Sequence, residues 1–445
     1  MLQHSLWTNP LLIIGAAIVL AYVGATILRR IGIPQTLGFM IAGIILGLVG
    51  IFTNDAVRFL NMVVPLALGL IGYNIGQELH HGNLGNRIKK LSVVVIIEAT
   101  ATFLLVSIVT YFFVSKLHWA FLFGAVASAT APAATADVIW EGECKGPLTS
   151  SLMFVLAADD IAAIILTNSA IAYALWIYNS ATGPLLYILL VPLAKILGAA
   201  LIGGVFGLLF ARITEYEPDR ASILEAEIGV VILLVGIVHA LEFSDIFAAM
   251  VFGYVVSKRL PSDAETVPHL MQKIMSPIIM LFFAMVGARM AHLLTVSTTL
   301  ISILVVAILY LVVRTGAKYI GARVGATLMK ESQVTKEYLG TCLFCQAGVA
   351  LGLSFIIEEQ FVSLGGEAAT IGSLLLGVVA LSTMALEAIG PLAVKWSLLN
   401  AGELPADGDA FDPHILGSSE DAHYEQPENP CEAEMKKEVT QKANK

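Results

Sequence analysis

Long apolar stretches, separated by short polar segments, recur along almost the whole chain. A helix needs about 20 apolar residues to cross hydrocarbon about 30 Å thick. The pattern predicts thirteen membrane spans, at 9–28, 33–52, 60–79, 91–115, 118–139, 148–177, 184–211, 222–241, 244–259, 270–291, 296–320, 337–357 and 367–395. The first is expected to be a true span rather than a signal peptide, because no Lys or Arg precedes Arg29. The sequence therefore predicts an all-α polytopic membrane protein.

Composition agrees with this prediction. Hydrophobic residues make up 57% of the 445 residues and charged residues only 13%, with a mean hydropathy of +0.83. A soluble core of this size would need a polar exterior, so a soluble enzyme is excluded. The net charge of −9 argues against a nucleic-acid partner. The four cysteines give no disulfide framework, and the single Cys342-x-x-Cys345 motif in an apolar run predicts neither a metal nor a redox cofactor.

Lys and Arg gather in alternate loops. One set of loops contains Arg29, Arg30, Arg87, Lys89, Lys90, Lys145, Arg212, Arg220, Lys258, Arg259, Lys273, Arg323, Lys330 and Lys336, whereas the opposite set contains only Arg58 and Lys116. Basic loops stay on the cytoplasmic side, so we expect the N-terminus outside and the C-terminus in the cytoplasm, in the inner (plasma) membrane. A count of twelve or fourteen spans would destroy this segregation.

The composition changes abruptly near the C-terminus. Residues 401–445 contain eleven acidic and four basic side chains and have no apolar periodicity. Such a segment cannot bury enough surface to fold alone. We therefore expect a transmembrane domain over residues 1–396 and a disordered acidic cytoplasmic tail over 397–445.

Two parts of the chain resemble each other. Segment 35–46 matches segment 245–256, which aligns Gly43 with Gly253 at an offset of 210, and Gly76 matches Gly287 at an offset of 211. An odd number of spans separates the matched elements, so the repeats, about 9–177 and 222–395 with 184–211 as a linker helix, are expected to be inverted. Inverted repeats imply a midplane site and alternating access, which favours a transporter over a channel or an enzyme.

Two adjacent acids lie in the middle of the sixth predicted span. Asp159 and Asp160 stand between apolar runs, at a depth where each ionised group costs about 2.5–3.5 kcal/mol to insert. Two carboxylates this close cannot easily both be ionised in a low dielectric. The pair is therefore suited to exchanging a proton for a monovalent cation. The alternative is a pair of acids at a helix break with no part in transport.

Pro132 lies in the middle of the fifth span and predicts that the helix breaks or unwinds there. Unwound carbonyls, together with the hydroxyls of Ser128 and Thr130, would offer oxygen ligands to Na⁺ or K⁺. A simple kink satisfied by these hydroxyls is the alternative. The expected repeat partner is the twelfth span, where Gln346 and Gly348 stand at the matching depth. Two half-helix pairs that cross there would need compensating charge.

Two cations lie in the eleventh span. Arg314 and Lys318 are four residues apart and so share one helix face. One of them is expected to neutralise Asp159, although Lys318 could instead extend to the membrane interface. Glu98 in the fourth span is expected to pair with one of these cations or, alternatively, to face a dimer or lipid interface.

With these residues in place, the sequence resembles the cation:proton antiporter-2 family of sodium or potassium/proton antiporters over about residues 10–395. The supporting motifs, in chain order, are Gly32-Ile-Pro34 leading into Ala42-Gly43, the run from Phe282 to Gly287, the run from Gln346 to Gly352, and Ile389-Gly-Pro391. The chain departs from many relatives at Ala131, where they have an acidic residue or serine. It departs from the related antiporter-1 family at Asp159 and Val155, where that family has Asn and Glu.

The resemblance implies a homodimer with a dimer domain and a mobile core domain that contains two crossed, discontinuous helices. It also implies that Asp160 is the main carboxylate for the cation and the proton, that Asp159 pairs with a cation of the eleventh span, and that Thr130 lies at the crossing. We therefore expect a secondary antiporter, not an enzyme, that exchanges Na⁺, or Li⁺ or K⁺, for H⁺ without a resident cofactor.

The alternative is a ligand-gated potassium efflux system of the same fold, although the sequence contains no recognisable nucleotide-binding domain. A membrane hydrolase would need its two aspartates on separate helices. Ion selectivity and stoichiometry do not follow from the sequence.

Overall fold

A computed structural model describes residues 9–30, 34–50, 63–78, 87–178, 185–214, 220–259, 266–295 and 297–404. Regular structure in these ranges is helical throughout, which confirms the all-α prediction. The helices are α2 (Pro10–Arg29), α3 (Gln35–Leu48), α5 (Val63–Glu78), α6 (Ile88–Val114), α7 (Leu117–Ala127), α8 (Pro132–Glu141), α9 (Pro147–Tyr178), α10 (Leu185–Thr214), α11 (Arg220–Ala240), α12 (Asp245–Arg259), α13 (Thr266–Thr295), α14 (Ser297–Leu328), α15 (Gln333–Cys342), α16 (Gly348–Val362) and α17 (Gly366–Asn400).

Each predicted span overlaps one helix or a pair of shorter ones. The fifth span corresponds to α7 and α8, and the twelfth to α15 and α16. Within the described part of the chain, eight helices are long and apolar enough to cross a membrane, and α3, α5 and α7 are shorter apolar helices. As a number of membrane crossings, thirteen remains a prediction.

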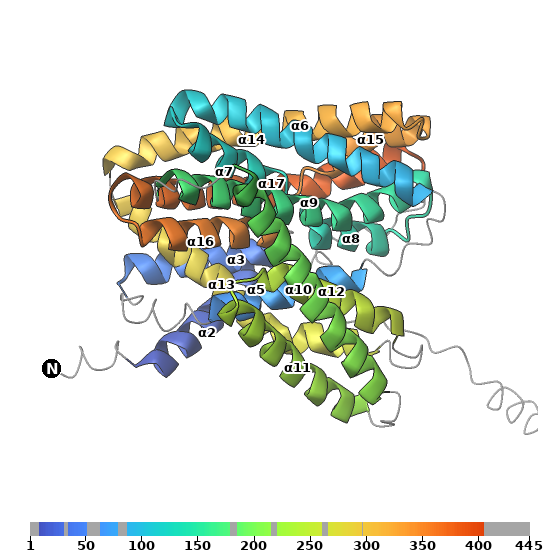
Figure 1. Ribbon diagram of the computed structural model, residues 1–445, viewed down its shortest axis with the longest axis horizontal. Helices are drawn as coiled ribbons and strands as arrows, with labels where there is room; N and C mark the ends of the chain where they lie inside the picture. Colours follow the sequence, from blue (N-terminus) through green and yellow to red (C-terminus); the bar gives the residue numbers. More distant parts are fainter. Residues whose placement is uncertain are drawn as a thin grey trace, which may run out of the picture.

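The helices form two groups (Figure 1). The first bundle contains α2, α3, α5, α10, α11, α12 and α13, in which α5 packs against α12 and α3 against α13. The second bundle contains α6 to α9 and α14 to α17, and α6 packs against α14. Helix α10 links the two, because it contacts both α9 and α12.

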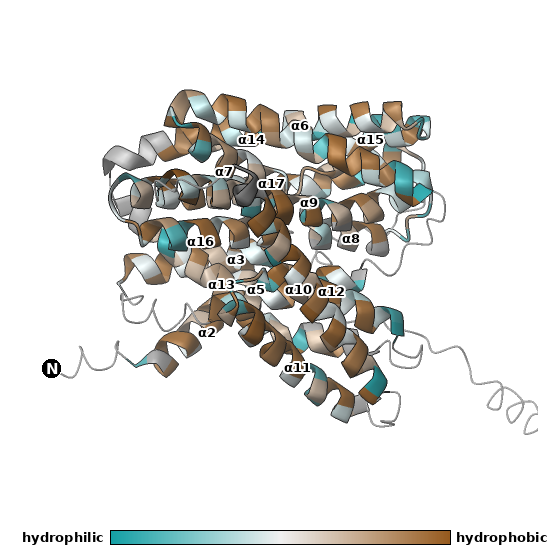
Figure 2. Ribbon diagram, viewed as in Figure 1, coloured by the Kyte–Doolittle hydropathy of each residue, from teal (hydrophilic) through white to brown (hydrophobic). Residues whose placement is uncertain are grey.

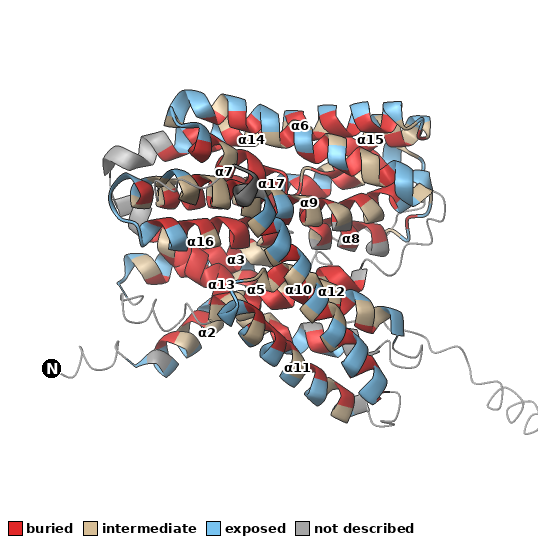
Figure 3. Ribbon diagram, in the orientation of Figure 1, coloured by how far each residue is buried: buried red, intermediate tan, exposed pale blue. Residues whose placement is uncertain are grey.

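The outward faces of both bundles are apolar. Figures 2 and 3 show hydrophobic residues on exposed helix faces, and Leu11, Phe112 and Leu201 are 78%, 76% and 69% exposed. Water would solvate so much apolar surface poorly, whereas lipid tails match it. The exposed surface is therefore that of a membrane protein.

Glycines bring helices of the first bundle into direct backbone contact. A Cβ atom on Gly43 of α3 would lie 1.9 Å from the carbonyl oxygen of Ala284 in α13, and one on Gly253 of α12 would lie 2.4 Å from that of Tyr73 in α5. Real Cβ atoms do not approach this closely, so only glycine fits at either position. The repeat aligns Gly43 with Gly253, and their partners Tyr73 and Ala284 are 211 residues apart.

The same pairing occurs at the second match of the repeat. A Cβ atom on Gly76 would lie 2.0 Å from the carbonyl oxygen of Met250, and one on Gly287 would lie 2.1 Å from that of Met40. Met40 and Met250 are 210 residues apart, which is the offset of the sequence repeat. The contact between α3 and α13 is therefore equivalent to the contact between α12 and α5.

The ordered chain extends past the predicted start of the tail at residue 397. Helix α17 continues to Asn400, Leu398 is buried, and the carboxylate of Glu403 accepts hydrogen bonds from the backbone N–H groups of Leu148 and Thr149, each at 2.7 Å. These N–H groups lie in the first turn of α9 and have no partner within the helix. The prediction of disorder from 397 is wrong up to residue 404, because Glu403 caps α9. Residues 405–445 lie outside the described ranges.

Candidate functional site

Two interrupted helices meet inside the second bundle. Helix α7 ends at Ala127 and α8 begins at Pro132, while α15 ends at Cys342 and α16 begins at Gly348. Pro132 stands at the first helical position, where its missing N–H leaves no hydrogen bond unmade. The backbone N–H of Ala131 donates to the carbonyl of Cys345 at 3.1 Å. The two unwound segments, 128–131 and 343–347, therefore contact each other.

Arg314 of α14 joins these segments. Its Nε donates to the carbonyl of Ala127 at 3.1 Å and its Nη2 to that of Ala129 at 2.6 Å, whereas Nη1 donates to Phe344 at 2.8 Å and Nη2 also to Cys345 at 3.2 Å. The carbonyls at the C-terminal end of a helix have no partner in the helix and carry partial negative charge. The fully buried guanidinium therefore compensates the ends of both α7 and α15 at once.

Lys318 lies one turn further along α14 and is also fully buried. Its Nζ forms an ion pair with Asp159 of α9, another with Glu98 of α6 at 2.9 Å, and a hydrogen bond to the carbonyl of Ser128 at 2.5 Å. The hydroxyl of Thr130 donates to the same carboxylate oxygen of Asp159. The expected partner of Asp159 is therefore Lys318 rather than Arg314, and neither Lys318 nor Glu98 faces lipid.

Asp160 follows Asp159 in the uninterrupted helix α9, and its side chain is fully buried. The site thus contains three buried carboxyl groups, Glu98, Asp159 and Asp160, and two buried cations, Arg314 and Lys318. If all five were ionised, one negative charge would remain. A single proton or a single monovalent cation would make the site neutral.

The structure places the other predicted residues at the same breaks. Gln346 donates to the hydroxyl of Tyr310 at 3.1 Å and to the carbonyl of Val126 at 3.4 Å. Gly348 begins α16 next to Ile71 of the first bundle. Ser128 contributes its carbonyl, because its hydroxyl donates back to Ala125 at 2.6 Å.

Sequence reasoning missed two supporting residues. Tyr310 contacts Gln346 from α14, and Thr102 donates to Glu98 at 3.0 Å from one turn further along α6. The spacing of Glu98 and Thr102, four residues apart on a helix, could have revealed the second contact. The first depends on how the unwound segment folds and has no signal in the local pattern.

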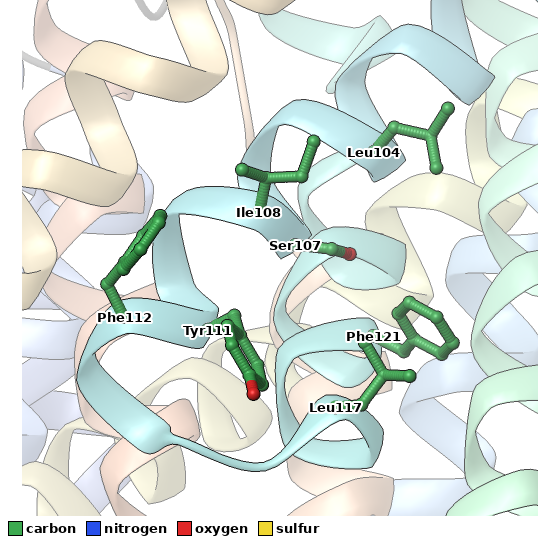
Figure 4. Close-up of a pocket in the computed structure, with 7 residues that line it drawn as sticks. All are labelled: Leu104, Ser107, Ile108, Tyr111, Phe112, Leu117 and Phe121. Carbon is green, nitrogen blue, oxygen red and sulfur yellow. The ribbon is translucent and has the colours of Figure 1, made fainter.

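A cavity of about 190 Å³ lies away from this site, between α6 and α7 (Figure 4). Its lining is almost entirely apolar: Leu104, Ser107, Ile108, Tyr111, Phe112, Leu117 and Phe121. Such a lining offers a cation few oxygen ligands, so the buried charges at the helix breaks remain the candidate site.

Comparison with known proteins supports this assignment. The family model described as sodium/hydrogen exchanger, transmembrane, matches residues 15–395. The structure is similar to that of the sodium proton antiporter MjNhaP1 from Methanocaldococcus jannaschii at pH 8, with a TM-score of 0.70 and 18% identity over 88% of this chain and 97% of that one. No curated protein matches the sequence. These matches confirm the resemblance to monovalent cation:proton antiporters, which are transporters and not enzymes. The chain belongs to the sodium/hydrogen exchanger family.

Proposed function

We propose that this protein exchanges a monovalent cation for protons, and that both bind at Asp160. The observation that carries the proposal is the buried cluster of Glu98, Asp159, Asp160, Arg314 and Lys318, which lacks one positive charge. Burying an uncompensated charge is strongly unfavourable, so the closed site needs either a proton or a cation. Because the cluster lacks only one positive charge, the proton and the cation compete to supply it.

The resemblance to cation:proton antiporters assigns the exchange to Asp160, which is fully buried directly after Asp159 in α9, while Asp159 binds Lys318 and Thr130. The carbonyls of the unwound segments and the hydroxyl of Thr130 would supply further oxygen ligands. Na⁺ is the first expected cation, with Li⁺ or K⁺ as further substrates, in keeping with the family match and the similarity in fold to a sodium proton antiporter.

Transport requires the site to open to one side of the membrane at a time. We infer that the second bundle is the mobile core domain, with its two interrupted helices crossing at the site, and that the first bundle is the dimer domain of a homodimer. Thirteen crossings, an external N-terminus and a cytoplasmic C-terminus complete this arrangement in the plasma membrane. The inverted repeat supports it, since inverted repeats are typical of alternating access.

The test is ion exchange in proteoliposomes that hold an imposed pH gradient. The wild-type protein should dissipate the gradient when Na⁺, Li⁺ or K⁺ is added. Asp160→Asn should lose this flux, because the amide binds no proton and has no negative charge to bind a cation. Asp245→Asn is the control, since Asp245 lies in the first bundle beside His239. Cation-dependent flux of wild-type rate in Asp160→Asn would overturn the proposal.

A further inference from the structure

The two bundles meet along a seam formed by α3, α5 and α13 on one side and α16 and α17 on the other. Its middle is apolar and tightly packed: a Cβ atom on Gly348 would lie 3.1 Å from Ile71, and one on Gly352 would lie 2.2 Å from Leu68. Movement of one bundle along the other requires this seam to rearrange.

Polar side-chain contacts between described residues cross the seam at two places. Arg289 of α13 binds both carboxylate oxygens of Glu358 in α16, each at 2.8 Å. The hydroxyl of Thr36 in α3 donates to the carboxyl group of Glu387 in α17. Each contact therefore joins the bundle that contains the buried charges to the other bundle.

The contacts lie at opposite ends of the seam. Thr36 is in the first turn of α3, whereas Gly47 near the other end of α3 packs against Ala288 and Ala291, which flank Arg289. Gly47 follows Thr36 by eleven positions, which is about 16 Å of helix at 1.5 Å per residue. One contact therefore closes each end.

The two ends differ in charge. At one end the guanidinium of Arg289 neutralises Glu358 directly. At the other, Glu387 is only 2% exposed and its partner, the Thr36 hydroxyl, is neutral. A buried carboxylate without a cation is strongly unfavourable, whereas the neutral acid is not.

The groups around Glu387 supply no compensating charge within the described part of the chain. The neighbouring titratable group is the thiol of Cys345, which packs against Gly390 one turn along α17. Three cations on packed helices bind other groups: Arg289 binds Glu358, Arg314 binds backbone carbonyls, and Lys318 binds Asp159 and Glu98. Lys395 lies two turns further along α17, and Lys336 is near the start of α15. Lys273 on α13 is exposed.

We propose that Glu387 is a second proton-binding site, which holds a proton while its end of the seam is closed and releases it to water when that end opens. The inference rests on the proposed function only for the movement between the bundles. It adds a proton-binding group to one end of the seam, whereas the Arg289–Glu358 end opens without releasing a proton from the seam itself. Because opening releases one proton, the open population should rise about tenfold for each unit by which the pH rises. This holds at pH values above those at which the exposed acid titrates.

The experiment is hydrogen exchange on the purified full chain without added cation, from pH 5 to 9, with protection at residues 35–40 of α3 corrected for the intrinsic exchange rate. Wild-type protection should fall by up to about tenfold per pH unit. Glu387→Gln should remove this slope, because the amide cannot release a proton. Glu387→Met, an apolar replacement of similar length, should remove it as well and covers the case in which the amide variant does not fold.

Glu227→Gln is the matched control. Glu227 is also fully buried and accepts a hydrogen bond from a hydroxyl, that of Tyr73, but both residues lie within the first bundle, so the wild-type slope should persist. A wild-type slope in both Glu387 variants, or no slope in the wild type, would overturn the inference. Asp160→Asn should keep the slope; this distinguishes failure at Glu387 from failure of the proposed exchange at Asp160, which the flux assay reports.

Discussion

Glycines bring helices close together in both bundles of this protein, as at Gly43 in the first and Gly124 in the second, but the bundles differ in their buried charges. In the first, glycines let α3 and α5 pack directly against the backbones of α13 and α12. In the second, buried cations on α14 bind the carboxyl groups of neighbouring helices and the carbonyls of two interrupted helices. Continuous helices satisfy their own backbone groups, whereas interrupted helices expose polar groups that can bind ions but must be compensated. This difference is in keeping with the proposal that the second bundle carries the ions and the first supports it.

The largest effect is expected from removing the cation that compensates both helix breaks. Arg314→Gln should lower the stability of the protein in detergent by about 3–5 kcal/mol, because buried carbonyls of α7 and α15 lose their donor. Arg323→Gln, on the exposed face of the same helix, should change stability by less than about 0.5 kcal/mol. Thermal unfolding of both variants is the measurement. Equal, small losses would show that the breaks do not depend on Arg314.

The corresponding test of the first bundle is an added methyl group. Gly43→Ala should destabilise by about 1–3 kcal/mol, because the new Cβ atom overlaps the backbone of α13. Gly253→Ala, at the position that the repeat aligns with Gly43, should destabilise the protein by a similar amount. Gly229 of α11 has no atom within 4 Å of its ideal Cβ position, so Gly229→Ala should be neutral or stabilise by up to about 1 kcal/mol. If all three variants unfold at one temperature, close glycine packing does not stabilise this bundle.

A smaller effect is expected from the coupling between Lys318 and Asp159. In a double-mutant cycle of Lys318→Gln and Asp159→Asn, the two changes should be less harmful together than separately, with an interaction energy of about 0.5–3 kcal/mol. The reason is that Lys318→Gln leaves the buried Asp159 without its cation, whereas Asp159→Asn leaves Lys318 with Glu98 alone. Stability should be measured at one fixed pH. Strict additivity would mean that the two side chains do not interact in the folded protein.

The smallest effect is expected from an exposed ion pair of the first bundle. Lys195 and Glu242 are 3.1 Å apart, with 39% and 82% of their side chains exposed. Water and salt screen such a pair, so Lys195→Gln should alter stability by at most about 1 kcal/mol. Unfolding of this variant at low and high salt checks the estimate. A loss as large as that of Arg314→Gln would remove the distinction between buried and exposed charge.

Much of the fold follows from the sequence. Apolar length located the helices, and Pro132 located the first break, because proline lacks the N–H that a continuous helix needs. The acids Asp159 and Asp160 were identified because ionisable residues are rare at this depth. These signals are local, so they do not depend on knowing how the helices pack.

The contacts at the site could not be predicted in the same way. Arg314 and Lys318 share one face of α14, and only the position of the unwound carbonyls decides which of them binds Asp159. The hydrogen bond between Thr36 and Glu387 joins residues 351 apart in the chain. Glu403 was assigned to a disordered tail because its local composition is polar, although it caps α9.

Competition between the proton and the cation is the central claim, and the most direct measurement is the apparent KM for Na⁺ of wild-type proteoliposomes over a series of pH values. If both ions bind to the same carboxyl group, the KM should rise by about tenfold for each unit by which the pH falls on the acidic side. The maximal rate at saturating Na⁺ should stay the same. A KM that does not change with pH, with a maximal rate that falls instead, would contradict the account.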